Sequence, residues 1–256
     1  MTVFQHIKQG KSSDEVAHQI EGLVLEGVLR SGDQLPSERE LAVDFGISRP
    51  VLRDAIEMLE NRKILQRRQG DGTFVCDVIG QVFSDPIASL LPLHRKATID
   101  YLEYRREIEG ITAGFAAIRA TKFDREMLEK CMKRMRKAHE TENFKEEALV
   151  DVEFHLLIGE MAHNLVLLHT LRSCYKLLSK GVFQNRSKLY ETAGGRQHLF
   201  DQHMAIANAI LAGESDQAAE AARAHLTYVI ERSAELENEE DRERISGLRF
   251  RQRNIS

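Results

Sequence analysis

Apolar residues recur at helical spacing in the first part of the chain, in three separate stretches. Residues 12–30 predict one amphipathic helix, with Gly32 placed to end it. The stretch LPSERELAVDFG predicts a second helix, because Ser37 and Glu40 have the S-x-x-E spacing of a capping box and Gly46 can terminate the helix. A third helix-periodic stretch begins shortly after Gly46, so the connection between the second and third helices is very short.

That third stretch, SRPVLRDAIEMLE, starts two residues after the terminating glycine. Ser48 is placed to cap the helix, and Pro50 is tolerated in its first turn. The following segment, ILQRRQGDGTFVC, alternates like a strand, breaks at Gly70-Asp71-Gly72 and then resumes, which is typical of a β-hairpin. Three helices with a tight turn, followed by a hairpin, predict a winged helix-turn-helix.

The rest of the chain is almost entirely helix-periodic. A connector with two of the four prolines, SDPIASLLPLHRK, leads into it, and no strand pattern follows, so we expect an all-α bundle and a mostly α protein. The expected helices span residues 98–120, 124–140, 145–162, 165–186, 196–212 and 215–236. The expected domains are a DNA-binding unit (1–78), a linker (79–97), the bundle (98–236) and a charged tail (237–256), read as a solvated or frayed helix end.

Composition narrows the class of protein. The 256 residues are 42% hydrophobic and 30% charged, which supplies ample core material, and no apolar run approaches the roughly 20 residues that span a bilayer. The first residues lack the apolar region of a signal peptide, so we expect a cytoplasmic protein with no membrane contact. The three cysteines (Cys76, Cys131 and Cys174) are scattered, which argues against a disulfide framework and against a thiolate zinc site.

Basic residues gather where a winged helix would meet DNA. Arg49 and Arg53 lie four residues apart at the start of the predicted recognition helix, whose first residues approach base edges in such proteins. Arg39 lies near the start of the preceding helix, and the glycines of the wing allow the backbone to approach a groove closely. The candidate DNA-binding residues are Arg39, Ser48, Arg49, Arg53, Gly70 and Gly72.

A competing interpretation is that these arginines form ordinary surface ion pairs, since Asp54 and Glu57 lie nearby. The net charge is −4, and residues 30–76 hold eight basic and eight acidic side chains. DNA, however, responds to a local patch of charge rather than to the average. The placement of the arginines therefore favours DNA binding.

A polar pair interrupts a predicted buried helix in the stretch DVEFHLLIGEMAHN. Asp151 and His155 lie four residues apart on a face whose other residues are small, among them Gly159, which would leave space beside the pair. His203 and His225 lie on the apolar stripes of two later helices. Four inward ligands can converge on one cation in a bundle, whereas the alternative is ordinary core histidines. Periodicity shows that these residues face inward, not that they meet.

The stretch LPSERELAVDFGISRPVLRDAIEMLENRKILQRRQGDGTFV resembles the DNA-binding domain of the GntR family of bacterial transcription regulators. The all-α half resembles the FCD effector domain of the FadR subfamily, so the resemblance covers residues 12 to about 236. It implies that Arg39, Arg49, Arg53 and Gly70 contact operator DNA. RRQGDGTFV and FSDPIASLL are most similar to regulators of pyruvate dehydrogenase, lactate and glycolate metabolism.

The same resemblance implies a divalent metal, because many FCD domains bind one through an aspartate and three histidines. The matching positions are Asp151, His155, His203 and His225. Such a donor set suits zinc, which we expect first, but also nickel, iron or manganese.

A small organic acid is the effector that the resemblance implies. Arg105 matches the E-x-R element of the family and is a candidate anchor for its carboxylate. The alternative for Arg105 is an ion pair with Glu109 or Glu103. Asn164 and Arg186 are further candidates for the rim of the pocket.

Together these features predict a homodimeric transcription regulator, expected to be a repressor, that binds double-stranded operator DNA and responds to pyruvate, lactate or glycolate. One alternative retains the regulator but makes the metal purely structural, with a sugar acid or fatty-acyl effector. A metal-dependent hydrolase is the other alternative. A hydrolase needs a general base beside the metal, and no H-E-x-x-H or comparable element is present, so no enzyme is expected.

Overall fold

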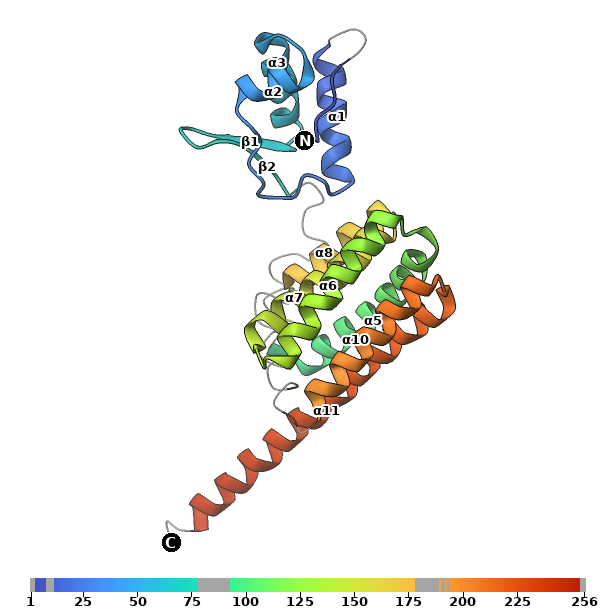
Figure 1. The fold of residues 1–256 in the computed structure, drawn as a ribbon. Coiled ribbons are helices and arrows are strands. Elements are labelled where there is room, and N and C mark those ends of the chain that lie inside the picture. The colour runs from blue at the N-terminus through green and yellow to red at the C-terminus, as the bar shows by residue number, and fades with distance from the viewer. Residues whose placement is uncertain are drawn as a thin grey trace. The chain divides into compact units, whose positions relative to one another are not determined.

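The computed structural model describes residues 3–7, 12–77, 93–177, 189, 192 and 194–253. The chain divides into two compact units, Met1–Gly80 and Gln81–Ser256, and each is described by itself. Figure 1 shows the short helices and the hairpin of the first unit and the long helices of the second.

The first unit consists of three helices and a two-stranded antiparallel sheet, which confirms the predicted winged helix-turn-helix. Its elements are α1 (Ser13–Leu25), α2 (Glu38–Phe45), α3 (Arg49–Asn61), β1 (Leu65–Arg68) and β2 (Gly72–Val75). In the hairpin Leu65 pairs with Val75 and Arg68 with Gly72. The chain just before α2 also pairs with β2, since the Leu35 amide donates to the Thr73 carbonyl over 2.8 Å.

The predicted signals around α2 operate as expected. The Glu40 carboxylate accepts from the Ser37 amide over 2.9 Å, and the Ser37 hydroxyl accepts from the Glu40 amide over 3.3 Å. Gly46 ends the helix with φ +67°, a left-handed conformation that glycine adopts without strain. The prediction for Ser48 was wrong in one respect. Ser48 occupies the N-cap position of α3, but its side chain makes no capping hydrogen bond.

The first helix is shorter than the sequence pattern predicts. It ends at Leu25 instead of continuing to residue 30, because Gly27 adopts φ +73° and turns the chain out of the helix. The Leu29 amide then reaches back to the Leu23 carbonyl over 3.0 Å, which satisfies one of the last carbonyls of the helix. Gly27, not Gly32, is therefore the terminating glycine.

The second unit is all-α over its described residues, as predicted. Its helices are α5 (Arg95–Arg119), α6 (Lys122–Glu140), α7 (Phe144–Met161), α8 (Leu165–Leu177), α10 (Gly195–Ala212) and α11 (Ser215–Arg253). The long helix α5 packs against α7, α8, α10 and α11, so it is the central element of the bundle. The predicted helix 165–186 is described only as far as Leu177, and the predicted linker 79–97 lies largely outside the described residues.

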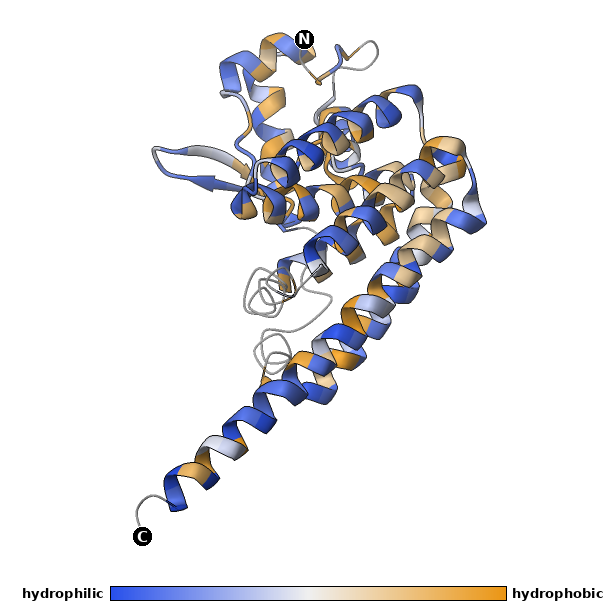
Figure 2. Ribbon diagram, turned by 60° about the horizontal axis from the view of Figure 1, so that its bottom comes forward, coloured by the Kyte–Doolittle hydropathy of each residue, from blue (hydrophilic) through white to orange (hydrophobic). Residues whose placement is uncertain are grey.

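The last helix is longer than its apolar pattern indicates. The sequence pattern ends near residue 236, but α11 continues to Arg253. Arg95 holds the helix at the edge of the bundle, since its guanidinium donates to Asn238 Oδ1 over 2.9 Å and lies 3.2 Å from Glu237 Oε2. Beyond this point the helix extends past the bundle, and Figure 2 shows that this extension is mostly hydrophilic.

Each unit has its own apolar core. In the first unit the core includes Phe45, Leu52 and Ile56, which are fully buried between the helices. In the second, Phe154 and Met161 of α7 are fully buried against residues of α5, α6, α10 and α11. Among the described residues, no helix combines the length and the apolar character that crossing a membrane requires.

We predict that Phe154→Ala lowers the free energy of unfolding of the bundle by about 3–5 kcal/mol, because it leaves a cavity in a closely packed core. Chemical denaturation followed by far-ultraviolet circular dichroism would measure this. Phe123→Ala is the matched control, since Phe123 is 64% exposed, and it should change stability by no more than about 0.5 kcal/mol. Equal losses in the two variants would contradict the placement of Phe154 in the core.

Candidate metal centre and DNA-binding surface

The start of α3 presents two arginines beside one carboxylate of α2. Arg53 Nε donates to Glu38 Oε2 over 2.8 Å, and Arg49 Nη2 lies 3.6 Å from the same oxygen. The hydrogen bond from Arg53, together with the positive charges of Arg53, Arg67 and Arg49, lowers the pKa of Glu38. The side chains of Arg49 and Arg53 remain more than half exposed, and Arg39 on α2 is exposed as well. Exposed ion pairs of this kind are weak. These arginines can therefore exchange Glu38 for another anion at little cost.

Two glycines shape the tip of the wing. Gly70 has φ +86° and Gly72 has φ +111°, conformations that favour glycine. A Cβ atom at Gly72 would lie 2.8 Å from Gln34 Nε2, whereas one at Gly70 would meet no atom within 4 Å. Arg68 stacks over Phe74, with its guanidinium carbon 4.3 Å from the ring centroid. The wing is thus a tight, basic turn.

The four predicted metal ligands come together inside the bundle. His203 Nε2 lies 3.3 Å from His155 Nε2 and 3.1 Å from Asp151 Oδ1. The three histidines, including His225, each offer a ring nitrogen, and these three nitrogens lie within 4.8 Å of one another. All four side chains are buried. They are supplied by α7 and by the consecutive helices α10 and α11, which follow α7 much later in the chain.

This donor set fits a divalent metal ion. Two nitrogens held about 2.0–2.1 Å from a tetrahedral zinc ion lie about 3.3 Å apart, which matches the separation of the two Nε2 atoms of His155 and His203. A buried carboxylate beside neutral imidazoles also needs a compensating charge. A divalent cation held by Asp151 and the three histidines would supply it.

Hydrogen bonds orient two of the histidines toward the centre. His155 Nδ1 lies 2.8 Å from Glu109 Oε2, and His225 Nδ1 lies 3.0 Å from Gln202 Oε1. Each Nδ1–H faces an oxygen acceptor, which directs Nε2 toward the other ligands, the arrangement usual for metal-binding histidines. The sequence interpretation missed this role of Glu109 and Gln202. Glu109 falls on the inner face of α5, four residues after Arg105, and that spacing was the only sequence signal available.

Arg105 forms the buried ion pair that was the alternative prediction for it. Its Nε and Nη2 donate to Glu109 Oε1 over 2.8 and 2.5 Å, and Tyr175 Oη donates to the same oxygen over 3.0 Å. Burial alone would raise the pKa of Glu109, but the charge of Arg105, together with His155, holds it well below its ordinary value. Glu109 is therefore an anion shared between Arg105, Tyr175 and His155.

Of the other two effector candidates, one has a capping role and the other is not described. Asn164 caps α8, since its Oδ1 accepts from the Leu167 amide over 3.1 Å, and Arg186 lies outside the described residues. The expectation that Gly159 leaves space beside the metal ligands was wrong. A Cβ atom there would lie 3.2 Å from Leu171 Cδ1, so this glycine makes room for a leucine of α8.

Two small hollows flank the ligand cluster. One, of about 220 Å³, is lined by Glu109, Thr112 and His155, together with apolar side chains. The other, of about 240 Å³ including its open mouth, is lined by Met135, His139, Glu147, Asp151, Arg196, Phe200 and His203. Both volumes include open solvent, and each hollow leaves only about 10 Å³ for the centre of a water molecule, which is room for about one water. Residues of the candidate metal cluster line both hollows, His155 the first and Asp151 and His203 the second.

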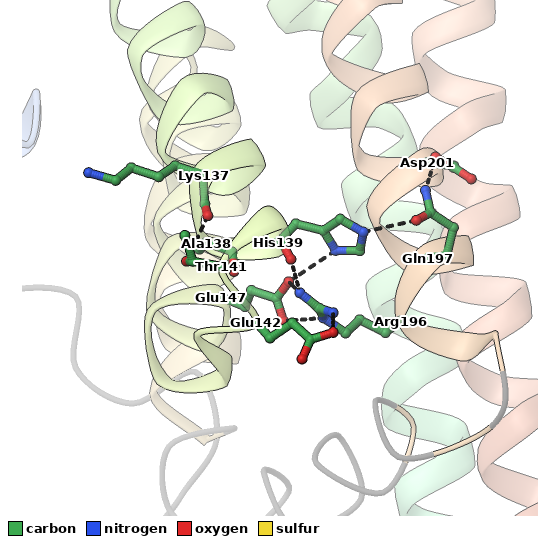
Figure 3. Close-up of polar contacts among 9 residues, drawn as sticks. All are labelled: Lys137, Ala138, His139, Thr141, Glu142, Glu147, Arg196, Gln197 and Asp201. Atoms are coloured by element: carbon green, nitrogen blue, oxygen red, sulfur yellow. Dashed lines mark hydrogen bonds and ion pairs between the residues drawn. The ribbon is translucent and has the colours of Figure 1, made fainter.

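A polar cluster that the sequence analysis did not identify borders the second hollow. Arg196 Nε donates to both oxygens of Glu147, over 3.0 and 2.9 Å, and Arg196 Nη2 donates to the carbonyl of His139. The two ring nitrogens of His139 lie 3.0 Å from Glu147 Oε1 and 2.9 Å from Gln197 Oε1 (Figure 3). This cluster ties the end of α6 to the starts of α7 and α10.

Comparison with known families divides the chain as the fold does. Residues 12–75 match the gntR family of bacterial regulatory proteins, and residues 100–228 match the FCD domain. Among solved structures, a GntR protein of Streptococcus agalactiae has a TM-score of 0.52 at 25% sequence identity, covering 86% of this chain and 99% of that one.

Named relatives extend the match over both units. An L-lactate dehydrogenase operon regulatory protein of Escherichia coli (strain K12) is 38% identical over 85% of this chain and 84% of its own length. The Glc operon transcriptional activator of the same strain is 34% identical over 88% and 89%. LutR, an HTH-type transcriptional regulator of Bacillus subtilis (strain 168), is 30% identical over 81% and 94%. The chain belongs to the gntR family, and it is a transcription regulator with an FCD domain rather than an enzyme.

Proposed function

We propose that this regulator binds a two-fold operator as a homodimer and that a small carboxylate, of the pyruvate, lactate or glycolate type, alters that binding at a metal centre in the FCD domain. The observation that carries the proposal is the convergence of Asp151, His155, His203 and His225 in the core of the bundle. The names of two relatives, which refer to the L-lactate dehydrogenase and Glc operons, support the choice of effector class.

Operator DNA would be bound through the face that carries the start of α3 and the wing. Arg49 and Arg53 would exchange Glu38 for phosphates or guanine edges, and Ser48 would lie beside them. Arg39 would reach the backbone from α2. Gly70 and Gly72 would allow the wing to approach a groove.

The metal would be held by one carboxylate and three imidazoles, and zinc is the ion we propose first. When bound, such a metal can accept the carboxylate and the hydroxyl or keto oxygen of an organic acid. Arg105 would bind the effector carboxylate only if Glu109 gave up part of its hold on the guanidinium. That exchange would change the orientation of His155 and therefore couple effector binding to the bundle.

A homodimer is supported by an apolar stripe on α5. Tyr104, Ile111 and Ile118 are seven residues apart on one face of the helix, and they are 39%, 41% and 61% exposed. Exposed apolar patches of this kind mark contacts between proteins. Two-fold operators also match two-fold proteins.

A metal that is purely structural, combined with a sugar acid or fatty-acyl effector, is the competing version. A gel-shift titration on the DNA upstream of this protein's own coding region would decide between them. We expect pyruvate, lactate or glycolate to shift the affinity for DNA only when metal is present. An unchanged effector response in folded, metal-free protein would favour the structural metal. Transcript levels in a deletion strain would decide between the repression proposed here and activation.

Arg49→Ala should weaken specific operator binding by about 1–3 kcal/mol, or roughly 5- to 150-fold, because a bidentate contact to a base is lost. Fluorescence anisotropy with specific and scrambled duplexes would measure the loss. Arg62→Ala is a matched control at the other end of α3, where Arg62 pairs with Glu21 and is similarly exposed. Equal effects of the two substitutions would argue against the proposed recognition surface.

Glu109→Gln should lower metal affinity about 10- to 100-fold, since the amide orients His155 less firmly and no longer raises its basicity. Competition with a chromophoric chelator would give the affinity. Glu107→Gln, an exposed position on the same helix, serves as the control and should leave it unchanged. An unaltered affinity in the Glu109 variant would remove this residue from the metal centre.

His203→Ala should lower the metal content of the purified protein and reduce the effector response, because His203 lies between His155 and Asp151. Elemental analysis and the gel-shift titration would measure the two effects. Full metal occupancy in this variant would exclude His203 as a ligand.

A further inference from the structure

The extension of α11 beyond the bundle is solvent-exposed along its length. From Asn238 to Arg253 every residue is exposed except Gly247, which is partly covered. Three large apolar side chains lie on it, with Ile245 40%, Leu248 50% and Phe250 70% exposed. Helices in proteins owe most of their stability to packing, and a glycine inside a helix disfavours it. An extension with this composition would gain stability from a partner.

Charge on this extension is divided into two blocks. At the start of the extension, residues 239–241 are all acidic, namely Glu239, Glu240 and Asp241. Residues 244–253 contain four basic residues and no acidic one, namely Arg244, Arg249, Arg251 and Arg253. Between the blocks lie Arg242 and Glu243, whose charges cancel. The helix is therefore polarised, acidic near the bundle and basic at its end.

We propose that this extension pairs with the same extension of a second copy of the chain, in antiparallel orientation, centred at Ile245. Antiparallel pairing places the basic block of each copy against the acidic block of the other. Parallel pairing would place like charges together along the whole contact. A two-fold axis makes the contact self-complementary, so it closes as a dimer. The inference rests on the proposed homodimer and adds a contact outside the α5 stripe.

The charge pattern favours a second copy over DNA as the partner. DNA phosphates would attract the basic block but repel the acidic block that directly precedes it. A second copy places an acidic block against the basic block and a basic block against the acidic one. Asp241 and Arg244, which lie 3.0 Å apart within one helix, could exchange partners between copies at little cost, because both are well exposed.

The first test uses reversal of charge. In one variant Arg249, Arg251 and Arg253 become Glu, and in a second Glu239, Glu240 and Asp241 become Arg. Each variant alone opposes like charges, so we expect subunit exchange between labelled dimers to accelerate about tenfold or more at low salt. The chain with all six substitutions restores complementarity and should return toward the wild-type rate. A change that only frayed the helix would not be rescued in this way.

A matched control places the same change of charge elsewhere. Lys130, Lys133 and Lys137 are exposed on α6, and changing all three to Glu should leave subunit exchange unaltered. If wild-type protein is a monomer, the proposed homodimer itself fails. If it is a dimer whose exchange is unaffected by either charge variant, only the pairing of the extensions is overturned. Weaker DNA binding with unchanged exchange would assign the basic block to DNA and would also overturn it.

The second test measures orientation. Single cysteines in place of Glu243 or Gln252 carry spin labels, in a Cys76→Ser background, since Cys131 and Cys174 are buried. Antiparallel pairing places the two Cα atoms about 12 Å apart at position 243 and about 23 Å apart at position 252. Short distances at both positions would mean parallel pairing and would contradict the proposal.

Discussion

The hydrogen bonds and ion pairs of the buried Glu109 carboxylate are the interactions on which the bundle most depends. One oxygen accepts from Arg105 and Tyr175, and the other faces His155, so a single anion joins α5, α7 and α8. Removing one partner from such a group leaves an unpaired charge in a low-dielectric interior, which is strongly destabilising. The same contacts hold the imidazole that faces the metal ligands. The stability of the bundle and the geometry of its centre are thus linked through one side chain.

The two units use charge in opposite ways. In the first unit Arg49 and Arg53 share Glu38 at the surface, where ion pairs are weak and easily exchanged for a phosphate. In the second, Arg105 and Glu109 are almost completely buried, and the pair persists unless a ligand replaces one partner. A surface that must bind and release DNA is suited to the first arrangement. A contact that must keep its geometry inside the bundle is suited to the second.

Local sequence signals predicted more of the structure of the first unit than of the second. Capping boxes, glycine turns and alternation are local signals, so the helices and the hairpin around Ser37, Gly46 and Gly70 follow from neighbouring residues. The end of α1 was predicted wrongly because Gly27 and Gly32 give the same local signal, and both adopt positive φ. Only the hydrogen bonds of the folded chain show that the helix ends before the first of them. The length of α11 was underestimated because its extension has no apolar face that periodicity could detect.

By itself, the sequence determined which side chains face inward, because helical periodicity assigns Asp151, His155, His203 and His225 to the apolar faces of their helices. Only the tertiary structure decided that they meet, since the helices that supply them are brought together by packing across long stretches of chain. It also decided that Arg105 pairs with Glu109 and not Glu103, and that Gly159 accommodates Leu171 rather than a ligand. The physical reason is the same in each case. The face of a helix on which a side chain lies follows from the sequence of that helix alone. The residue that the side chain contacts depends on which other helix packs against that face.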